Sequence, residues 1–373
     1  MDFCLSQDET DISDTVDMAG RIFIIMMMMT ASWTVTAHEV REFYNGARAL
    51  AMGGASIAVA NDETSLALNP AGLGKLRDIY GTILDPEIET SDNLLNLYRS
   101  SPFGGMFEPE KIVRSLSENL GTTYHAKATM FPSFVAKNFG IGLIRRNTLD
   151  ARVDDTGTLM NTFYQDDMAL LLGFNLKMWG GRIKLGATGK FISRIEIDKD
   201  LPVSGPLDIA SNASEGAAVG ADIGLNLTAP VVWLPTLSAV VRDVGGTRFS
   251  AGSGLRMSTA NRPNAMKQDV DVALAVFPIH SQDSRSVFTA EYRKIGEAAT
   301  ATDKTRYSHL GYEYNYGDTY FFRMGMNQKY WTTGFEIASE YTQFQIAYYG
   351  EDIGSDGDSE EQRRLVMKFT FRF

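Results

Sequence analysis

The chain has 373 residues, with 35 basic and 46 acidic side chains, so its formal net charge is −11. The mean hydropathy is −0.14, and the longest apolar run, Ile22 to Met29, is shorter than the roughly 20 residues that a membrane-spanning helix needs. This composition disfavours a bundle of membrane helices, and an acidic chain without a basic tract gives no reason to expect nucleic-acid binding.

The N-terminal region carries an export signal. Residues 2–17 hold six acidic side chains and no basic one, after which Arg21 begins a signal peptide of a positive, an apolar and a small-residue region. We predict that residues 1–37, an extension followed by a signal peptide over 18–37, are removed before His38; the alternative is a buried N-terminal helix. Removal takes away six acids and one base, so the mature charge is 34 − 40 = −6. It also removes the single cysteine, which excludes thiol catalysis and cysteine metal sites.

Beyond residue 122 the sequence alternates with a period of two residues, in segments separated by turn residues. The clearest segment runs from Arg182 to Asp198, with apolar side chains mainly at odd positions and charged ones mainly at even positions. Soluble strands are usually about 5–6 residues long, so an alternation of this length is typical of a membrane barrel. The last strand alternates in the same way and places Phe369, Phe371 and Phe373 outward, as an expected signal for the barrel-assembly machinery.

The connections alternate in length, as they do in an outer-membrane barrel with short periplasmic turns and longer outer loops. Short links occur at 179–181 and 315–318, and longer polar ones at 199–214 and 249–265, although an outer link near 329–332 is short. We therefore predict an all-β fold, a closed antiparallel transmembrane β-barrel of 14 strands. The predicted strands span 76–85, 123–137, 140–153, 162–178, 182–198, 215–229, 236–247, 266–277, 285–294, 305–315, 319–329, 333–341, 344–350 and 363–373.

Aromatic residues are expected at both membrane interfaces. Trp179 and Trp233 lie beside short turns, whereas Tyr330 and Trp331 lie at an outer end. The barrel is thus predicted to span residues 76–373 in contact with outer-membrane lipid.

Two regions do not fit the barrel wall. The insert 86–122 has helical spacing over 91–98 and 108–120, which predicts an outer loop that holds short helices. Residues 38–75 precede the first strand and are rich in Gly and Ala, so we expect them in the lumen or in the periplasm.

This N-terminal region resembles a known signature. Residues 46–55 are GARALAMGGA, residues 58 and 62 are Ala and Asp, and residues 69–73 are NPAGL. These motifs resemble the FadL-like superfamily, which includes long-chain fatty-acid transporters and the PorV-type shuttles of type IX secretion. The resemblance implies a fourteen-stranded barrel in the outer membrane of a Gram-negative bacterium, with residues 38–75 folded inward as a hatch. A weaker likeness to the PorV-like branch covers residues 216–246.

The residues of the motif suit a hatch. Gly53 and Gly54 allow close backbone approach to a wall, and Asp62 can cap a short helix over residues 63–68. Asn69-Pro70, followed by Ala71, is a natural end for that helix, because proline has no backbone donor. The alternative is that residues 46–75 form an ordinary edge segment with a turn.

No catalytic or metal-binding pattern stands out, and we expect no enzyme activity, metal or other cofactor. The four histidines fit no helical ligand pair, and the sequence has no Gly-x-Ser-x-Gly elbow. The acidic outer loop between Asp352 and Glu361 does not match a calcium loop, so it is a solvated loop or, alternatively, a surface that recruits divalent cations.

Charged side chains at inward positions have both signs, so they could line a polar channel or pair across the lumen and clamp the hatch, the arrangement that we favour. The set is Lys184, Lys190, Arg194, Glu196, Asp269, Asp271, Glu291, Arg293, Glu313, Arg323, Glu336 and Glu340. Pro132 interrupts the second strand and removes a ladder donor, so we expect a kink or gap in the wall there.

Two functions are consistent with these features. The first is passive uptake of a hydrophobic small molecule such as a fatty acid, with a pocket under the insert. Its expected lining is Phe103, Met106, Phe107, Ile112, Val113 and Leu116. The second is a PorV-like scaffold or shuttle that binds a secreted or periplasmic protein. A simple porin is less consistent, because a hatch blocks open diffusion.

Overall fold

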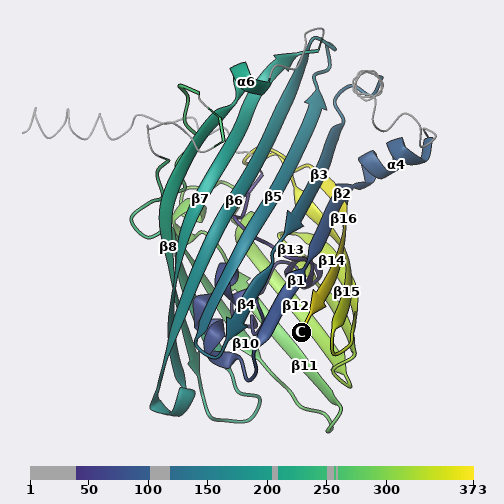
Figure 1. Ribbon diagram of the computed structural model, residues 1–373. Coiled ribbons are helices and arrows are strands. Elements are labelled where there is room, and N and C mark those ends of the chain that lie inside the picture. The colour runs from purple at the N-terminus through teal and green to yellow at the C-terminus, as the bar shows by residue number, and fades with distance from the viewer. Residues whose placement is uncertain (1–38, 101–117, 204–208, 250–255, 258) are drawn as a thin grey trace, which may run out of the picture. The chain divides into compact units, whose positions relative to one another are not determined.

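A closed antiparallel sheet surrounds the N-terminal segment in the computed structural model (Figure 1). The structure describes residues 39–100, 118–203, 209–249, 256–257 and 259–373. The predicted signal peptide lies outside the described residues and stays a prediction.

Two of the strands of the barrel are each divided into two segments. The first strand consists of β1 (Tyr80–Leu84) and β2 (Pro86–Ser91), and the second of β3 (Thr123–Met130) and β4 (Ser133–Ala136). Each later segment is a strand of its own: β5 (Phe139–Val153), β6 (Leu159–Met178), β7 (Ile183–Pro202), β8 (Ser214–Thr228), β9 (Thr236–Arg242), β10 (Asp269–Val276), β11 (Ser284–Tyr292), β12 (Ser308–Tyr316), β13 (Tyr320–Asn327), β14 (Tyr330–Ala338), β15 (Thr342–Asp352) and β16 (Glu361–Arg372).

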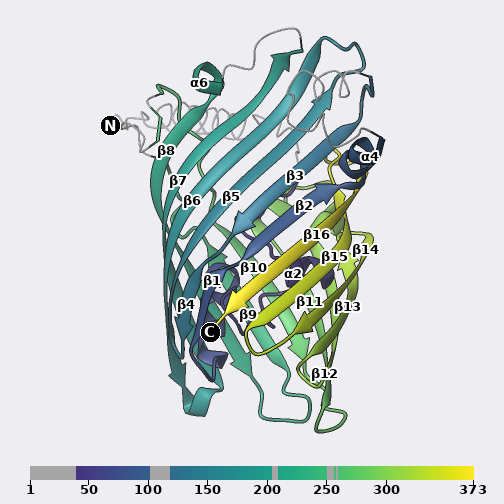
Figure 2. The same ribbon diagram turned by 45° about the vertical axis from the view of Figure 1, so that its right-hand side comes forward.

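The last strand closes the barrel on the first. Both β1 and β2 pair with β16, and every neighbouring pair is antiparallel, which confirms the predicted 14-stranded barrel. Phe373 exchanges two backbone hydrogen bonds with Gly81, at 3.0 and 3.1 Å. Strands β5 to β8 rise above the rest of the wall (Figures 1 and 2).

The first strand is the main error in the predicted boundaries. It was placed at 76–85, whereas it extends to Ser91, so the insert begins at residue 92 and not at 86. Glu87 and Glu89 give this segment the look of a polar loop, but both side chains are buried on the lumen side. The predicted helix at 91–98 is present as α4 (Asp92–Ser100).

Apolar side chains cover the outward face of the wall. The exposed set includes Leu143, Leu172, Phe191, Phe322, Met324 and Phe369. Trp179 and Trp233 are exposed beside the turns at one end of the strands, and Trp331 is exposed near the other end. An apolar outward band with aromatic residues at its two edges is what a membrane-spanning barrel requires. No helix among the described residues is long and apolar enough to cross a bilayer.

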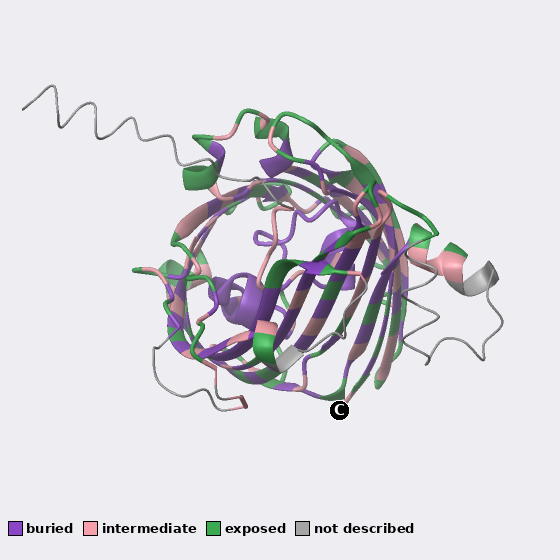
Figure 3. Ribbon diagram, turned by 90° about the horizontal axis from the view of Figure 1, so that it is seen from above, coloured by how far each residue is buried: buried purple, intermediate pink, exposed green. Residues whose placement is uncertain are grey.

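The short helices lie in the N-terminal segment and in the connections. They are α2 (Ala47–Ala51), α3 (Ser65–Leu68), α6 (Ile209–Asn212) and α7 (Ile295–Ala298), together with the 3-10 turns η1 (Pro70–Lys75), η3 (Trp179–Gly181) and η4 (Lys304–Tyr307). The view along the barrel shows the buried N-terminal segment inside the ring of strands (Figure 3). We call residues 39–75 the hatch.

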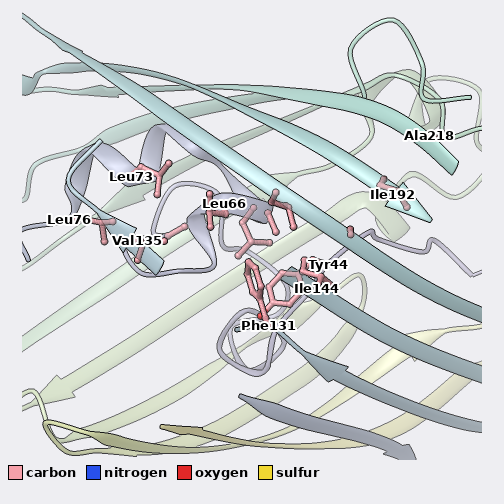
Figure 4. Close-up of a cluster of buried hydrophobic side chains, with 14 of the residues drawn as sticks. Tyr44, Leu66, Leu73, Leu76, Phe131, Val135, Ile144, Ile192 and Ala218 are labelled. Atoms are coloured by element: carbon pink, nitrogen blue, oxygen red, sulfur yellow. The ribbon is translucent and has the colours of Figure 1, made fainter. Parts of the chain in front are cut away.

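The largest apolar core lies between the hatch and the wall (Figure 4). Leu66 and Leu73 of the hatch pack against Val135 and Ile192 of the wall, and all four side chains are buried. The lumen is therefore filled at this level by a folded segment with its own core, which holds the hatch in one position.

Candidate functional site

Glycines bring the backbone of the hatch against the wall. Gly53 and Gly54 have φ values of +66° and +86°, a conformation that side chains with a Cβ rarely adopt. A Cβ at Gly53 would also overlap the carbonyl oxygens of Leu310 and Met326. His309 Nδ1 lies 2.8 Å from Gly53 O. The turn after α2 is therefore fitted to β12 and β13.

The Asn-Pro-Ala motif makes a second junction with the wall. Asn69 is fully buried, and its side chain donates to Ile57 O at 2.8 Å and to Asn226 Oδ1 at 3.0 Å. The same side chain accepts a hydrogen bond from Ala71 N at 3.0 Å. A Cβ at Gly186 of β7 would overlap the backbone that follows Pro70. As predicted, the helix ends before Pro70, at Leu68.

Asp62 has a different role from the predicted helix cap. The helix begins at Ser65, so it is shorter than the expected 63–68. Asp62 Oδ1 accepts a hydrogen bond from Thr64 N at 3.0 Å, which caps the preceding turn. Its other oxygen lies 3.0 Å from Arg48 Nη1. Asp62 thus connects two parts of the hatch, because the turn it stabilises is also held by Arg48.

Arg48 forms a bidentate ionic link between hatch and wall. Its Nε and Nη2 each lie 3.0 Å from a different oxygen of Glu313 on β12. This bidentate geometry is the strong form of an arginine–carboxylate pair. Glu313 also pairs with Arg323 at 2.7 Å, and Arg323 pairs with Glu336 at 2.5 Å. The charges on β12, β13 and β14 are therefore compensated through a chain that ends on the hatch.

Other wall charges bind backbone groups of the hatch. Glu291 accepts hydrogen bonds from Ser56 N at 2.6 Å and Ile57 N at 2.9 Å. Glu87 accepts one from Ala47 N at 2.9 Å, and Arg293 donates to Gly54 O. Buried charges need such partners, so these contacts support the clamp and not an open polar channel.

Some of the inward charges predicted from the sequence form their ion pairs within the wall. Lys190 pairs with Asp222 and Asp243 of the wall, each at 2.7 Å, and Arg194 pairs with Asp167. Glu340 was placed inward wrongly: it lies in the exposed turn between β14 and β15. A one-residue error at a strand end reverses the face on which a side chain lies.

The first residues of the hatch enter a buried polar network. Glu39 binds Arg364 of β16 through two hydrogen bonds of 2.8 and 2.9 Å. Arg41 pairs with Asp150 of β5 at 3.1 Å, and His125 lies between Asp150 and Glu89 at 2.5 and 3.0 Å. Except for Asp150, these residues border a polar cavity of about 70 Å³. The described lumen at this level has room for water molecules but not for a long acyl chain.

The first two strands are interrupted side by side. Their pairing stops between Thr82–Ser133 and Pro86–Met130. Three residues of the first strand face two of the second across this gap, and Ile83 and Leu84 are both exposed, as in a β-bulge. Pro132 lies in the gap, where the sequence predicted it. Pro132 O accepts a hydrogen bond from Leu143 N of β5, so the N–H that the proline lacks is missing from the ladder with β5.

The gap adjoins the apolar core of the hatch. Phe131 is buried, and its ring meets that of Tyr44 edge-on at a centroid distance of 5.3 Å. Figure 4 shows these two rings together with Ile144. An apolar surface therefore reaches from the hatch to the interruption in the wall.

The residues predicted to line a ligand pocket lie outside the described part of the chain. They are Phe103, Met106, Phe107, Ile112, Val113 and Leu116, and the pocket stays a prediction. The helix that precedes them, α4, packs Leu94 and Leu97 against an apolar cluster of the wall that contains Tyr124. His125 lines the lumen, so the neighbouring side chain of Tyr124 lies on the opposite, outer face of the strand. Helix α4 therefore contacts the outer face of the wall and not the mouth of the lumen.

The acidic outer loop is used for structure in the described residues. Asp356 accepts hydrogen bonds from the backbone N–H groups of Thr302 and Asp303. A hydrogen bond from the Lys329 side chain, 2.8 Å away, lowers the pKa of Asp303 to about 2. Within the described residues, no three His, Cys, Asp or Glu side chains form a group that could hold a metal.

Sequence reasoning missed several residues that hold the hatch. Glu39, Glu87 and Asn226 were not singled out, although Asn226 lies on β8 at an alternating inward position. The inward parity of each strand could have identified Glu87 and Asn226 as candidates. No pattern in the sequence marks Glu39, because its partner is 325 residues away.

Comparisons with known proteins agree with this fold. No protein-family model and no curated protein matches the sequence. The monoaromatic hydrocarbon channel CymD is 11% identical, with a TM-score of 0.52 over 92% of this chain and 99% of that chain. A deletion mutant of the monoaromatic hydrocarbon channel TodX is 14% identical, with a TM-score of 0.54 over 89% and 99%. A FadL homologue of Pseudomonas aeruginosa is 11% identical over 90% and 98%, with a TM-score of 0.48. The two hydrocarbon channels, with TM-scores above 0.5, show that the chain has their barrel fold, which is FadL-like.

Proposed function

We propose that the protein is an outer-membrane barrel of a Gram-negative bacterium that takes up hydrophobic small molecules, such as fatty acids, without an energy source. The observation that carries this proposal is the paired interruption of the first two strands beside the apolar core of the hatch. The FadL-like fold supports it, since the solved structures of this fold include channels for monoaromatic hydrocarbons.

The interruption offers an apolar path through the wall. On the lumen side Phe131 and Tyr44 present aromatic rings, and on the membrane side Ile83 and Leu84 are exposed. A molecule that leaves the lumen here enters the hydrocarbon of the bilayer and never has to be solvated by water. That path suits a hydrophobe and excludes a sugar or an ion.

The hatch argues against open diffusion of polar solutes. Among the described residues, two small cavities that border the hatch measure about 70 and 20 Å³. A general porin keeps a water-filled channel. Uptake through this barrel therefore requires the hatch or the adjoining wall to move.

The test replaces Pro132 with valine. Leu143 N of β5 donates to Pro132 O at 2.9 Å, so residue 132 stands opposite Leu143, and a valine N–H would complete that pair of ladder bonds and hold the strand that borders the gap more rigidly against β5. We expect Pro132→Val to reduce uptake of a labelled long-chain fatty acid and of a labelled monoaromatic by cells that depend on this barrel. Phe134→Val is the matched control, because it places a β-branched residue on the same outward face and adds no donor.

Equal uptake by the wild type, Pro132→Val and Phe134→Val would contradict the lateral path. Absence of uptake of either hydrophobe by the wild type would contradict the function itself.

A further inference from the structure

A single buried lysine joins the hatch to the interruption in the wall. Lys368 of β16 is 3% exposed, and its Nζ lies 3.1 Å from Asp85 Oδ2 and 3.7 Å from Glu63 Oε1. Asp85 is also buried, and it lies between β1 and β2, at the interruption itself. Glu63 belongs to the hatch and precedes α3. The ammonium of Lys368 therefore lies between the gap in the wall and the hatch.

Carboxylates outnumber ammonium groups in this cluster. Glu87 of β2 is buried and is the direct partner of Lys368 across the sheet. Asp85 and Glu87 each accept a hydrogen bond, at 2.6 and 2.9 Å respectively. Among the described residues, the single ion pair of Glu63 is the one with Lys368, and its 3.7 Å is longer than a hydrogen bond. Glu63 is therefore the least compensated of the three acids.

The surroundings of Glu63 offer no second free cation among the described residues. Arg48 borders the same small cavity as Glu63, but it is bound to Asp62 and Glu313. The titratable groups around Glu63 lie on the hatch, the first strand and β16, and they are Tyr44, Arg48, Asp62, Asp85, Glu87 and Lys368. A buried carboxylate without adequate compensation binds a proton in preference to remaining charged.

A proton can reach Glu63 from water. The cavity that borders Glu63 and Lys368 measures about 20 Å³, which is room for about one water molecule. Burial raises the pKa of Glu63 from 4.5 to about 7; the charges of Asp62 and Asp85 act in the same direction, whereas Lys368 opposes them. The closed hatch thus favours the neutral form of this side chain.

We propose that Glu63 is a proton-controlled latch of the hatch. In the closed hatch its carboxyl group is protonated and needs no cation, which leaves Lys368 to Asp85 and Glu87 of the wall. When Glu63 gives its proton to water, three carboxylates compete for one ammonium, and repulsion favours an open hatch in which water solvates Glu63. The latch lies beside the interrupted strands, so its release loosens the hatch next to the uptake path; this last step rests on the proposed function.

The direction and size of the effect follow from the two states of Glu63. In an open hatch the side chain is exposed and its pKa returns to 4.5. The stabilisation of the closed hatch is complete below pH 4.5 and is lost as the pH rises through 7. Between pH 5.5 and pH 8.5 these two pKa values imply a rise of about 30-fold in the open population.

The test is hydrogen exchange of the whole barrel in mild detergent at pH 5.5 and pH 8.5, with rates corrected for the intrinsic pH dependence of amide exchange. We expect protection of wild type over residues 56–68 to be about 30-fold lower at the higher pH. Glu63→Gln, which imitates the protonated carboxyl group, should keep the same protection at both pH values. Glu340→Gln is the matched control and should behave like wild type, because Glu340 lies in the exposed turn between β14 and β15.

Protection of wild type that does not change with pH would overturn the latch, and so would an equal fall in wild type and Glu63→Gln. The mobility of unheated samples on gels identifies a variant that fails to fold, and Glu63→Met then replaces Glu63→Gln. Exchange needs no substrate, so this result is independent of whether the barrel takes up hydrophobes.

The link to uptake is measured separately with a monoaromatic hydrocarbon, which does not titrate. Its entry should be faster at pH 8.5 than at pH 5.5 through wild type and equal at both through Glu63→Gln. Equal entry through wild type at the two pH values would overturn the link between the latch and uptake.

Discussion

Replacing Arg48 with alanine should loosen the hatch while leaving the barrel intact. Arg48 is the only residue of α2 that makes an ion pair with the wall among the described residues, through two bonds of 3.0 Å to Glu313. Its side chain is 19% exposed and that of Glu313 is 5% exposed, so the pair is largely desolvated.

The magnitude follows from what Glu313 retains. Removal of one partner of a buried ion pair costs about 3–5 kcal/mol. Glu313 keeps Arg323 at 2.7 Å, so we expect a smaller loss of about 2–3 kcal/mol from the free energy that holds the hatch closed. A factor of ten corresponds to 1.4 kcal/mol, so the open population should rise about 30- to 140-fold.

Hydrogen exchange measures that population directly. Amide protection over residues 47–58 should fall by this factor, whereas the amides of β5 to β8 should keep theirs. Arg145→Ala is the matched control, because Arg145 is an outward arginine paired with Asp166 at 2.7 Å. If Arg48→Ala leaves the protection of the hatch unchanged, or lowers that of the whole barrel equally, the role of Arg48 as a local clamp is refuted.

Three further predictions concern the hatch and the outer loops. Gly186→Ala should displace the hatch at a cost of about 1–3 kcal/mol by overpacking. Gly189→Ala is the control and should be neutral, because nothing lies within 4 Å of a Cβ at that position. Equal melting temperatures of the two variants in thermal unfolding would contradict the contact between Gly186 and the hatch. Asn69→Ala should lower hatch protection by about 1–3 kcal/mol because buried partners lose their hydrogen bonds, and unchanged exchange over residues 56–71 would contradict this. The pKa of Asp303 is lowered from 3.8 to about 2, so its contact with Lys329 stabilises the loops above pH 3.8, and this stabilisation is lost as the pH falls through 2. Lys329→Met should raise the pKa of Asp303 in a carboxylate NMR titration. An unchanged pKa would refute the pairing.

The strands could be predicted because apolar and polar residues alternate along a membrane strand, according to whether they face the lipid or the lumen. From β3 to β16 the alternation between lipid and lumen fixed both the existence and the face of each strand. The first strand was misplaced because Glu87 and Glu89 point into a lumen filled by the hatch, and local polarity alone cannot distinguish that environment from water. The N-terminal motif identified Gly53, Asn69 and Pro70 as hatch residues, and each contacts the wall or its neighbours in the hatch.

The partners of those residues could not be predicted. Arg48 and Glu313 are 265 residues apart, and the sequence shows only that both are charged.

The central claim, uptake of hydrophobes past a closed hatch, is tested most directly in vesicles with a lipopolysaccharide outer leaflet, which hydrophobes cross slowly. Vesicles with and without the barrel are compared for entry of a labelled long-chain fatty acid, a monoaromatic hydrocarbon and a small sugar. We expect the barrel to accelerate entry of a hydrophobe and to leave the sugar excluded. Entry of the sugar without faster entry of either hydrophobe would show an open porin. No faster entry of any of the three compounds, together with a tightly co-purifying protein, would show a scaffold. Either result would contradict the account.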